Sequence, residues 1–129
     1  MKGVVFTTDE KMYVKDFEEP LYKTAGKVVG GPIELVYPER LDSPFLLIAN
    51  EEGRIHQLPF NIFASAISTG ERYPYGIIGN VVLMKKGIRN GEEDIVGLTE
   101  DEINEIISMA CEISDGTIEI INQEEVSND

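Results

Sequence analysis

The side chains best suited to chemistry lie close together in the sequence, between positions 50 and 61. They include Arg54 and His56, the only histidine of the chain. The alternating pattern over residues 54–58 predicts a strand, so these two side chains would share one face. A guanidinium beside an imidazole can hold an anionic or nucleotide-like ligand, while asparagine amides recognise its polar edges. The predicted ligand-binding residues are Asn50, Arg54, His56 and Asn61.

The same four residues also have a purely structural interpretation. Asn50 and Gly53 can form a tight turn, because both residue types tolerate positive φ. Asn61 can cap a helix over residues 62–68, which leaves the two basic side chains on a solvated strand face. The residue pattern leaves both interpretations open.

Patterns typical of catalysis or metal binding are weak in this sequence. A nucleophile needs a neighbouring base, and only one histidine is present. The sequence has no Cys-x-x-Cys, no histidine pair, no EF-hand spacing, no P-loop and no Gly-x-Gly-x-x-Gly fingerprint. We therefore expect a binding protein that is not an enzyme and needs no cofactor or metal.

The formal net charge of −13 arises entirely at one end of the chain. Residues 1–90 carry 11 acidic and 11 basic side chains, whereas residues 91–129 carry 13 acidic side chains and no Lys, Arg or His. An asymmetry of this kind concerns partners and solubility. Phosphate backbones need a basic face, so we do not expect direct binding to nucleic acid.

A helix is predicted between residues 99 and 115, and one of its faces is acidic. Isoleucines recur at helical spacing on the other side, which makes the helix amphipathic. A row of carboxylates can imitate DNA phosphates and enter a basic groove of a protein partner, or it can simply keep the protein soluble. The predicted partner-binding residues are Asp101, Glu105, Glu112 and Asp115.

The remaining composition indicates one small cytoplasmic domain. Its 129 residues fit a single domain over 1–129, with residues 122–129 as a frayed acidic tail. The single cysteine excludes an internal disulfide and suits a reducing cytoplasm. The first apolar run, residues 3–6, is too short for a signal peptide or a membrane span, so we expect no membrane contact.

The hydrophobic pattern predicts more strands than helices. Strands are expected over residues 3–8, 12–17, 33–37, 45–49, 54–58, 76–84 and 117–121, with loops over 38–44 and 85–97. Helices are expected over residues 18–30, 62–68 and 99–115, the last opened by a capping box of Thr99 and Glu102. Strands do not alternate strictly with long helices, which favours a mixed or mostly antiparallel sheet. The predicted fold class is therefore α+β, with two or three short helices and a terminal amphipathic acidic helix.

Several short motifs resemble those of one known family. They are Asn-Glu-x-Gly at 50–53, Leu-Pro-x-Asn at 58–61, Gly-Ile-Ile-Gly-Asn-Val-Val at 76–82 and Leu-Thr-Glu-Asp-Glu at 98–102. Together with the short helix that leads into Gly-Gly-Pro at 30–32, this order is similar to the domain-of-unknown-function family numbered 3846, over about residues 1–107. Its members are small proteins of phages, plasmids and other bacterial mobile elements, and the family has no assigned catalytic residues to carry over.

The resemblance implies a context for binding. Small acidic proteins of mobile elements often act on the host: they inhibit a defence protein, sequester a signalling nucleotide or imitate DNA. We therefore expect a counter-defence factor in the host cell cytoplasm that sequesters a nucleotide-like signal, with its pocket at a homo-oligomer interface. Two alternatives stay open: an inhibitor or DNA mimic that binds a host protein through the acidic helix, and an accessory regulatory protein with no immune role.

Overall fold

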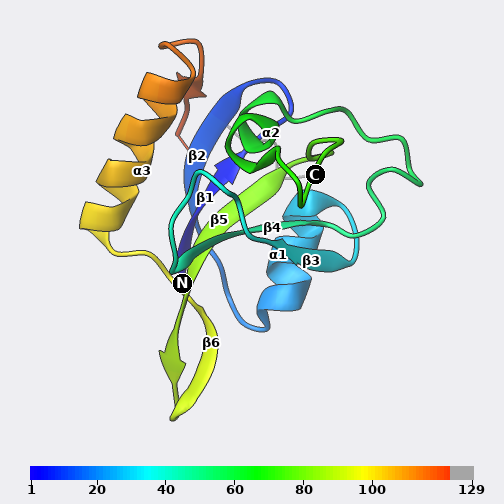
Figure 1. Cartoon of the computed structure of the whole chain (residues 1–129). Helices are drawn as coiled ribbons and strands as arrows, with labels where there is room; N and C mark the ends of the chain where they lie inside the picture. Colours follow the sequence, from blue (N-terminus) through cyan, green and yellow to red (C-terminus); the bar gives the residue numbers. More distant parts are fainter. Residues whose placement is uncertain (123–129) are drawn as a thin grey trace.

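A mostly antiparallel sheet forms the centre of the protein (Figure 1). The computed structural model describes residues 1–122, and over this range the sheet contains seven strands in the order β3–β4–β5–β1–β2–β7, with β6 paired to β5. All pairings are antiparallel except the one between β2 and β7. The strands are β1 (Lys2–Phe6), β2 (Lys11–Asp16), β3 (Ile33–Val36), β4 (Phe45–Asn50), β5 (Val81–Arg89), β6 (Glu92–Val96) and β7 (Glu119–Ile120).

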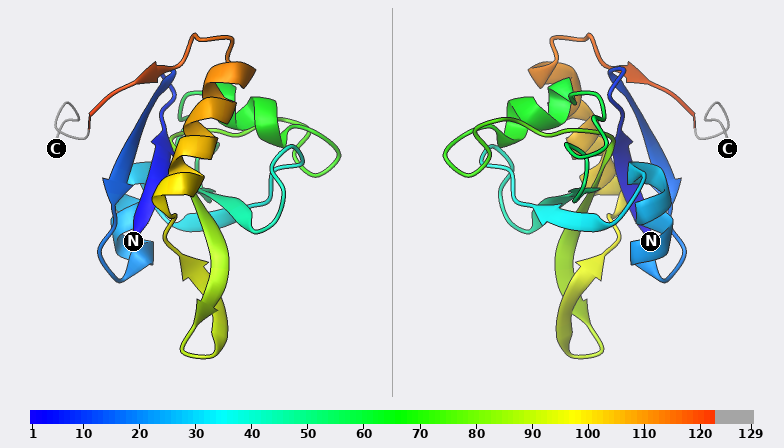
Figure 2. Two further views of the ribbon diagram at one scale, coloured as in Figure 1. Left: turned by 90° about the vertical axis from the view of Figure 1, so that its left-hand side faces the viewer. Right: turned by 90° about the vertical axis from the view of Figure 1, so that its right-hand side faces the viewer.

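Helices cover both faces of this sheet (Figures 1 and 2). They are α1 (Leu21–Val29), α2 (Ile62–Ser68) and α3 (Glu100–Ile113). Alternate residues of a strand point to opposite faces, so Val5 packs with α1, whereas Val4 and Phe6 pack with α2 and α3. The described residues thus confirm the predicted α+β class, including the mostly antiparallel sheet and the acidic helix near its end.

The two central strands are buried on both faces. Residues 46–48 of β4 and 81–84 of β5 have no exposed surface. A strand covered on both sides favours a continuous apolar run over an alternating one. This burial explains why both segments read as uninterrupted hydrophobic sequence.

Two predicted helix starts are confirmed. The side chain of Asn61 caps α2 by accepting a hydrogen bond from Ala64 N. Thr99 and Glu102 form the predicted capping box of α3. These bonds satisfy backbone N–H groups that have no partner within the helix, so each helix begins at a defined residue.

The expected strand over residues 54–58 is wrong, because residues 51–57 form consecutive turns. Local backbone hydrogen bonds close these turns, such as the one from His56 N to Glu52 O at 3.1 Å. Groups that pair within the segment cannot also pair with a neighbouring strand. Arg54 and His56 therefore lack the shared strand face that the alternating pattern indicated.

The expected loop over residues 85–97 is also wrong. The second half of β5 pairs with β6 in a hairpin that projects from the rest of the protein (Figure 1). Asn90 and Gly91 at its turn have φ angles of 53° and 80°, the left-handed pair that a two-residue hairpin turn favours. Conversely, residues 76–80 were expected to begin a strand but form an irregular segment that leads into β5.

The last part of the chain departs from the prediction in length. The final strand, expected over residues 117–121, is the two-residue β7. The expected frayed tail lies outside the described residues except for Asn122. Within the described range, none of the helices has the length and apolar character needed to cross a lipid bilayer.

Candidate functional site

A cavity of about 270 Å³ lies at the β3 edge of the sheet. It opens between the turns that follow β4 and the loop over residues 71–78 that precedes β5. We call it the Arg54 groove. Its charged and aromatic lining is formed by Glu34, Glu51, Arg54, Arg72, Tyr73 and Tyr75.

Two arginines line this groove without a carboxylate partner. Within residues 1–122, neither Arg54 nor Arg72 forms an ion pair. The guanidinium carbon of Arg54 lies 5.2 Å from the centre of the Tyr75 ring, in a cation–π contact. Tyr75 is 76% exposed, so its ring remains largely open to solvent. The groove thus offers guanidinium donors next to an accessible aromatic ring.

Two carboxylates, Glu34 and Glu51, line the same groove. Burial raises the pKa of Glu34, and the nearby charge of Glu51 raises it further. A carboxylate accepts hydrogen bonds from hydroxyl and amino groups. The groove therefore presents acceptors as well as guanidinium donors, and a ligand that fits it carries both an anionic group and hydrogen-bond donors.

Asn61 holds the loop that forms one wall of the groove. Its Nδ2 donates to Gly79 O at 2.9 Å and to Phe6 O at 3.0 Å, and its Oδ1 accepts from Ala64 N at 2.9 Å. The side chain is fully buried and does not line the groove. The structure places this predicted ligand-binding residue behind the wall, where it positions the loop.

Further side chains fix the same loop at other points. Ser65 Oγ accepts from Ile77 N at 2.8 Å and donates to Ile77 O at 3.2 Å. Tyr73 Oη accepts from Tyr37 N at 3.0 Å, which ties the start of the loop to the end of β3. Sequence reasoning missed these contacts, because they join positions 12 and 36 residues apart and follow no local motif.

The other predicted ligand-binding residues divide between the groove and the surface. Asn50 lines the groove, but its Nδ2 donates to Val29 O at 3.1 Å and its Oδ1 accepts from Glu52 N at 2.7 Å. His56 is exposed and outside the groove lining, and its Nε2 lies 3.5 Å from Glu52 Oε1. The structure therefore brings Asn50 and Arg54 to one groove and leaves His56 outside it.

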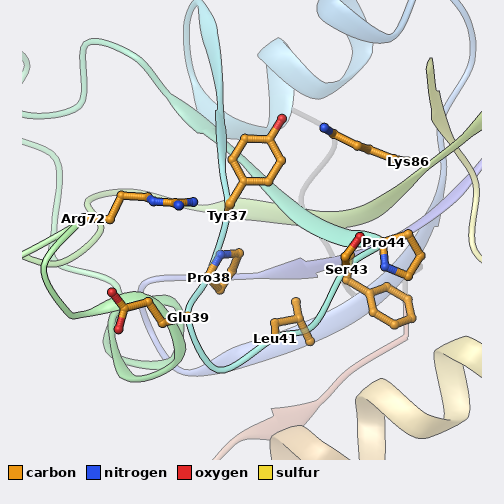
Figure 3. A pocket seen from close by; sticks show the side chains of 9 residues that line it. Tyr37, Pro38, Glu39, Leu41, Ser43, Pro44, Arg72 and Lys86 are labelled. Carbon is orange, nitrogen blue, oxygen red and sulfur yellow. The ribbon is translucent and has the colours of Figure 1, made fainter. Parts of the chain in front are cut away.

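A second cavity, of about 320 Å³, lies beyond the end of β3 (Figure 3). We call it the Tyr37 cavity, and its lining includes Tyr37, Glu39, Ser43, Pro44, Arg72 and Lys86. Lys86 Nζ lies 4.9 Å from the centre of the Tyr37 ring and 3.2 Å from Glu93 Oε1. Arg72 lines both cavities. The sequence did not indicate this cavity, because the segment 37–45 forms it only together with Arg72 and Lys86, which are distant in the chain.

The predicted partner-binding carboxylates lie on a different part of the surface. Figure 1 shows α3 on the opposite side of the molecule from the loop before β5. Among residues 1–122, these carboxylates are all exposed and none forms an ion pair: Asp101, Glu105, Glu112 and Asp115. In the same described range, no three His, Cys, Asp or Glu side chains gather in a way that could hold a metal ion.

Comparison with known proteins assigns the chain to a family. A family model described as Domain of unknown function (DUF3846) matches residues 1–110. No curated protein and no solved structure matches the chain. Because the family match covers most of the 129 residues, the chain belongs to the DUF3846 family, and the resemblance found in the sequence motifs is confirmed.

Proposed function

We propose that this DUF3846 member is a non-catalytic binding protein that holds a small nucleotide-like ligand in the Arg54 groove. One observation carries the proposal: two arginines without an ion pair in residues 1–122 line one groove with an exposed tyrosine. Because Arg54 and Arg72 line the same groove, their guanidinium donors can converge on one external anion.

The chemistry of the lining matches the parts of a nucleotide. A guanidinium fork matches the geometry of phosphate oxygens, and Arg54 and Arg72 supply two such forks. The open ring of Tyr75 offers a stacking surface for a base. Glu34 and Glu51 can accept hydrogen bonds from ribose hydroxyls or exocyclic amino groups, which favours a nucleotide over bare phosphate.

Binding of this kind would act by sequestration. A ligand held in the groove is withheld from its receptor, and the amount withheld depends on protein concentration and affinity. A counter-defence role follows where the ligand is a nucleotide signal of the host, as the resemblance to mobile-element proteins implies. To sequester the signal, the protein would then need to be abundant and to bind tightly, but it would need no catalytic step.

Calorimetric titration with nucleoside monophosphates and cyclic mononucleotides tests the proposal. We expect Arg54→Ala to weaken binding by about tenfold or more, since a charge-assisted hydrogen bond contributes roughly 1.5–3 kcal/mol. Arg40→Ala is the matched control, because Arg40 is also exposed and without an ion pair in residues 1–122 but lines neither cavity. Absence of binding across the panel, or equal binding by the Arg54 variant, would contradict the proposal.

A second candidate function rests on the acidic face of α3. Asp101, Glu105 and Glu112 lie on α3, and Asp115, with a φ of 53°, lies in the turn that follows the helix. All four predicted carboxylates are exposed and have no ion-pair partner among the described residues. We propose that a partner with a basic groove, such as a DNA-binding protein, docks on this face as it would on a phosphate backbone. This use of α3 is compatible with a ligand in the Arg54 groove, because the two surfaces lie apart (Figure 1).

A further inference from the structure

Arg72 stands at the boundary between the two cavities. It lines both the Arg54 groove and the Tyr37 cavity. The side-chain hydroxyl of the next residue, Tyr73, accepts a hydrogen bond from Tyr37 N at 3.0 Å. This bond holds the loop against the end of β3, so the backbone beside Arg72 is fixed between the two cavities.

Each cavity pairs a tyrosine with a cation. In the Arg54 groove, the guanidinium of Arg54 lies 5.2 Å from the Tyr75 ring centre. In the Tyr37 cavity, Lys86 Nζ lies 4.9 Å from the Tyr37 ring centre. Figure 3 shows the guanidinium of Arg72 directed toward Tyr37 from the side opposite to Lys86. The two cavities thus repeat one combination of ring and cation on either side of Arg72.

The wall of the Tyr37 cavity is fixed by backbone bonds to two other elements. Arg40 N donates to Ile67 O at 3.0 Å, which ties the loop after β3 to α2. Lys86 N donates to Pro44 O at 2.8 Å, which ties the end of the same loop to β5. A cavity held in this way is formed before a ligand arrives, and preformed cavities are typical of small-molecule sites.

The size of each cavity suits one nucleotide-sized unit. The volumes are about 270 Å³ for the Arg54 groove and 320 Å³ for the Tyr37 cavity. Small-molecule pockets range from roughly 300 to 1,000 Å³, so each cavity lies near the lower limit. A ligand of two ring-bearing units would need both.

We propose that the Arg54 groove and the Tyr37 cavity are two lobes of one site, which binds a dinucleotide. This inference rests on the proposed function and names its ligand class. One base stacks at Tyr75 and the other at Tyr37, while the guanidinium of Arg72 binds the phosphodiester that joins the two units. Joining the units makes the second contact intramolecular, so a dinucleotide binds more tightly than either mononucleotide alone.

Calorimetric titrations with pApA and pGpG, set against AMP and GMP, test this inference. We expect the better dinucleotide to bind at least about tenfold more tightly than its mononucleotide. Tyr37→Leu should remove this advantage and leave mononucleotide affinity within about twofold, because the Arg54 groove is intact. Tyr37 also packs against buried residues beside α1, so Lys86→Gln serves as a second variant and should reduce the same advantage.

Tyr22→Leu is the matched control, since Tyr22 lies on α1 and is 63% exposed. It should leave both affinities unchanged. The two-lobe site would be overturned if dinucleotides bound no more tightly than mononucleotides. It would also be overturned if the tighter binding of dinucleotides persisted in both Tyr37→Leu and Lys86→Gln. Either result would leave the proposed function standing. Failure of the wild-type protein to bind either class would overturn both.

Discussion

Asn61 joins three parts of the chain through one amide. Its bonds reach β1 at Phe6, the loop before β5 at Gly79 and the first turn of α2 at Ala64. The side chain has no exposed surface, so no water can replace a lost partner without entering the core. A buried carbonyl without a donor costs about 1–3 kcal/mol, which makes Asn61 a large local contribution to stability.

We expect Asn61→Ala to lower the free energy of unfolding by about 2–4 kcal/mol, because it removes the helix cap and the two hydrogen bonds to the carbonyls of Phe6 and Gly79. Urea denaturation followed by circular dichroism measures this change. Asn104→Ala on the exposed side of α3 is the control and should stay within about 0.5 kcal/mol. A loss below about 1 kcal/mol for the Asn61 variant would mean that the core relaxes to satisfy both carbonyls.

The cap formed by Asn61 could be predicted from the sequence, because a cap joins residues only three positions apart. Its two other bonds could not, since their acceptors lie 55 and 18 residues away and are plain backbone carbonyls. For the same reason, the sequence could not predict the hydrogen bonds by which Ser65 and Tyr73 hold the loop. Ligand binding by Asn50 and Asn61 stays a prediction, although the structure shows both amides engaged within the protein.

The start of α3 combines a capping box with an ion pair. Glu102 Oε1 accepts from Thr99 N at 2.8 Å and from Lys85 Nζ at 2.7 Å, and the helix is thereby joined to β5. Partial burial pushes the pKa of Glu102 up, but the hydrogen bonds from Lys85 and Thr99 outweigh it and hold the pKa below the usual 4.5. The charged form of Glu102 therefore stabilises the folded state.

We expect Glu102→Gln to cost about 0.5–1 kcal/mol at pH 7, since the amide keeps an acceptor for Thr99 but loses the attraction to Lys85. The folded-state pKa lies below the unfolded value, so this stabilisation is complete above pH 4.5 and is lost as the pH falls through the folded-state pKa. Urea titrations from pH 3 to pH 7 should show the two proteins converging in acid. Glu105→Gln, at an exposed position, should match the wild type throughout.

The sequence predicted element boundaries correctly where side chains act locally, as at the helix caps. The predictions were wrong where the pairing of backbone groups determines the structure. The alternation over residues 54–58 is typical of a strand, yet local turn bonds take up its backbone groups. The hairpin turn carries the Asn90–Gly91 signal, but its flanking residues are charged and their pairing depends on β5 continuing past the core. Apolar content identified the buried strands, but it did not predict the exposed hairpin of β5 and β6.

At the scale of the whole molecule, charge separates into two regions. The cavities at the β3 edge combine arginines with glutamates, whereas α3, on the far side of the molecule (Figure 1), presents a row of carboxylates alone. The sequence predicted the acidic region, because helical spacing places its carboxylates on one face. Of the two groove arginines it predicted only Arg54, because they come from separate loops that the fold brings together.

In a pull-down assay with the immobilised protein as bait, the wild type should capture basic host proteins. We expect the triple variant Asp101→Lys, Glu105→Lys and Glu112→Lys to capture none. Each reversal replaces a negative by a positive charge, so the net charge changes from −13 to −7 and the row of carboxylates is lost. Capture by the wild type should fall in roughly 0.5 M salt and in the presence of competing duplex DNA.

The variant Asp101→Glu, Glu105→Asp and Glu112→Asp preserves every charge and should retain capture. Arg54→Ala should also retain it, because the Arg54 groove lies away from α3 (Figure 1). Equal capture by the reversed variant would show that the acidic face serves solubility alone.

The grouping of tyrosines at the two cavities has an optical consequence. The sequence holds five tyrosines and no tryptophan, so near-ultraviolet emission comes from tyrosine alone. Three of the five, Tyr37, Tyr73 and Tyr75, line the Arg54 groove or the Tyr37 cavity. A base stacked on such a ring would quench its fluorescence, so a nucleotide bound in either proposed lobe would change the emission of the unlabelled protein. Intrinsic tyrosine fluorescence therefore serves as a label-free binding assay, and variants that replace one tyrosine at a time would identify which lobe is filled.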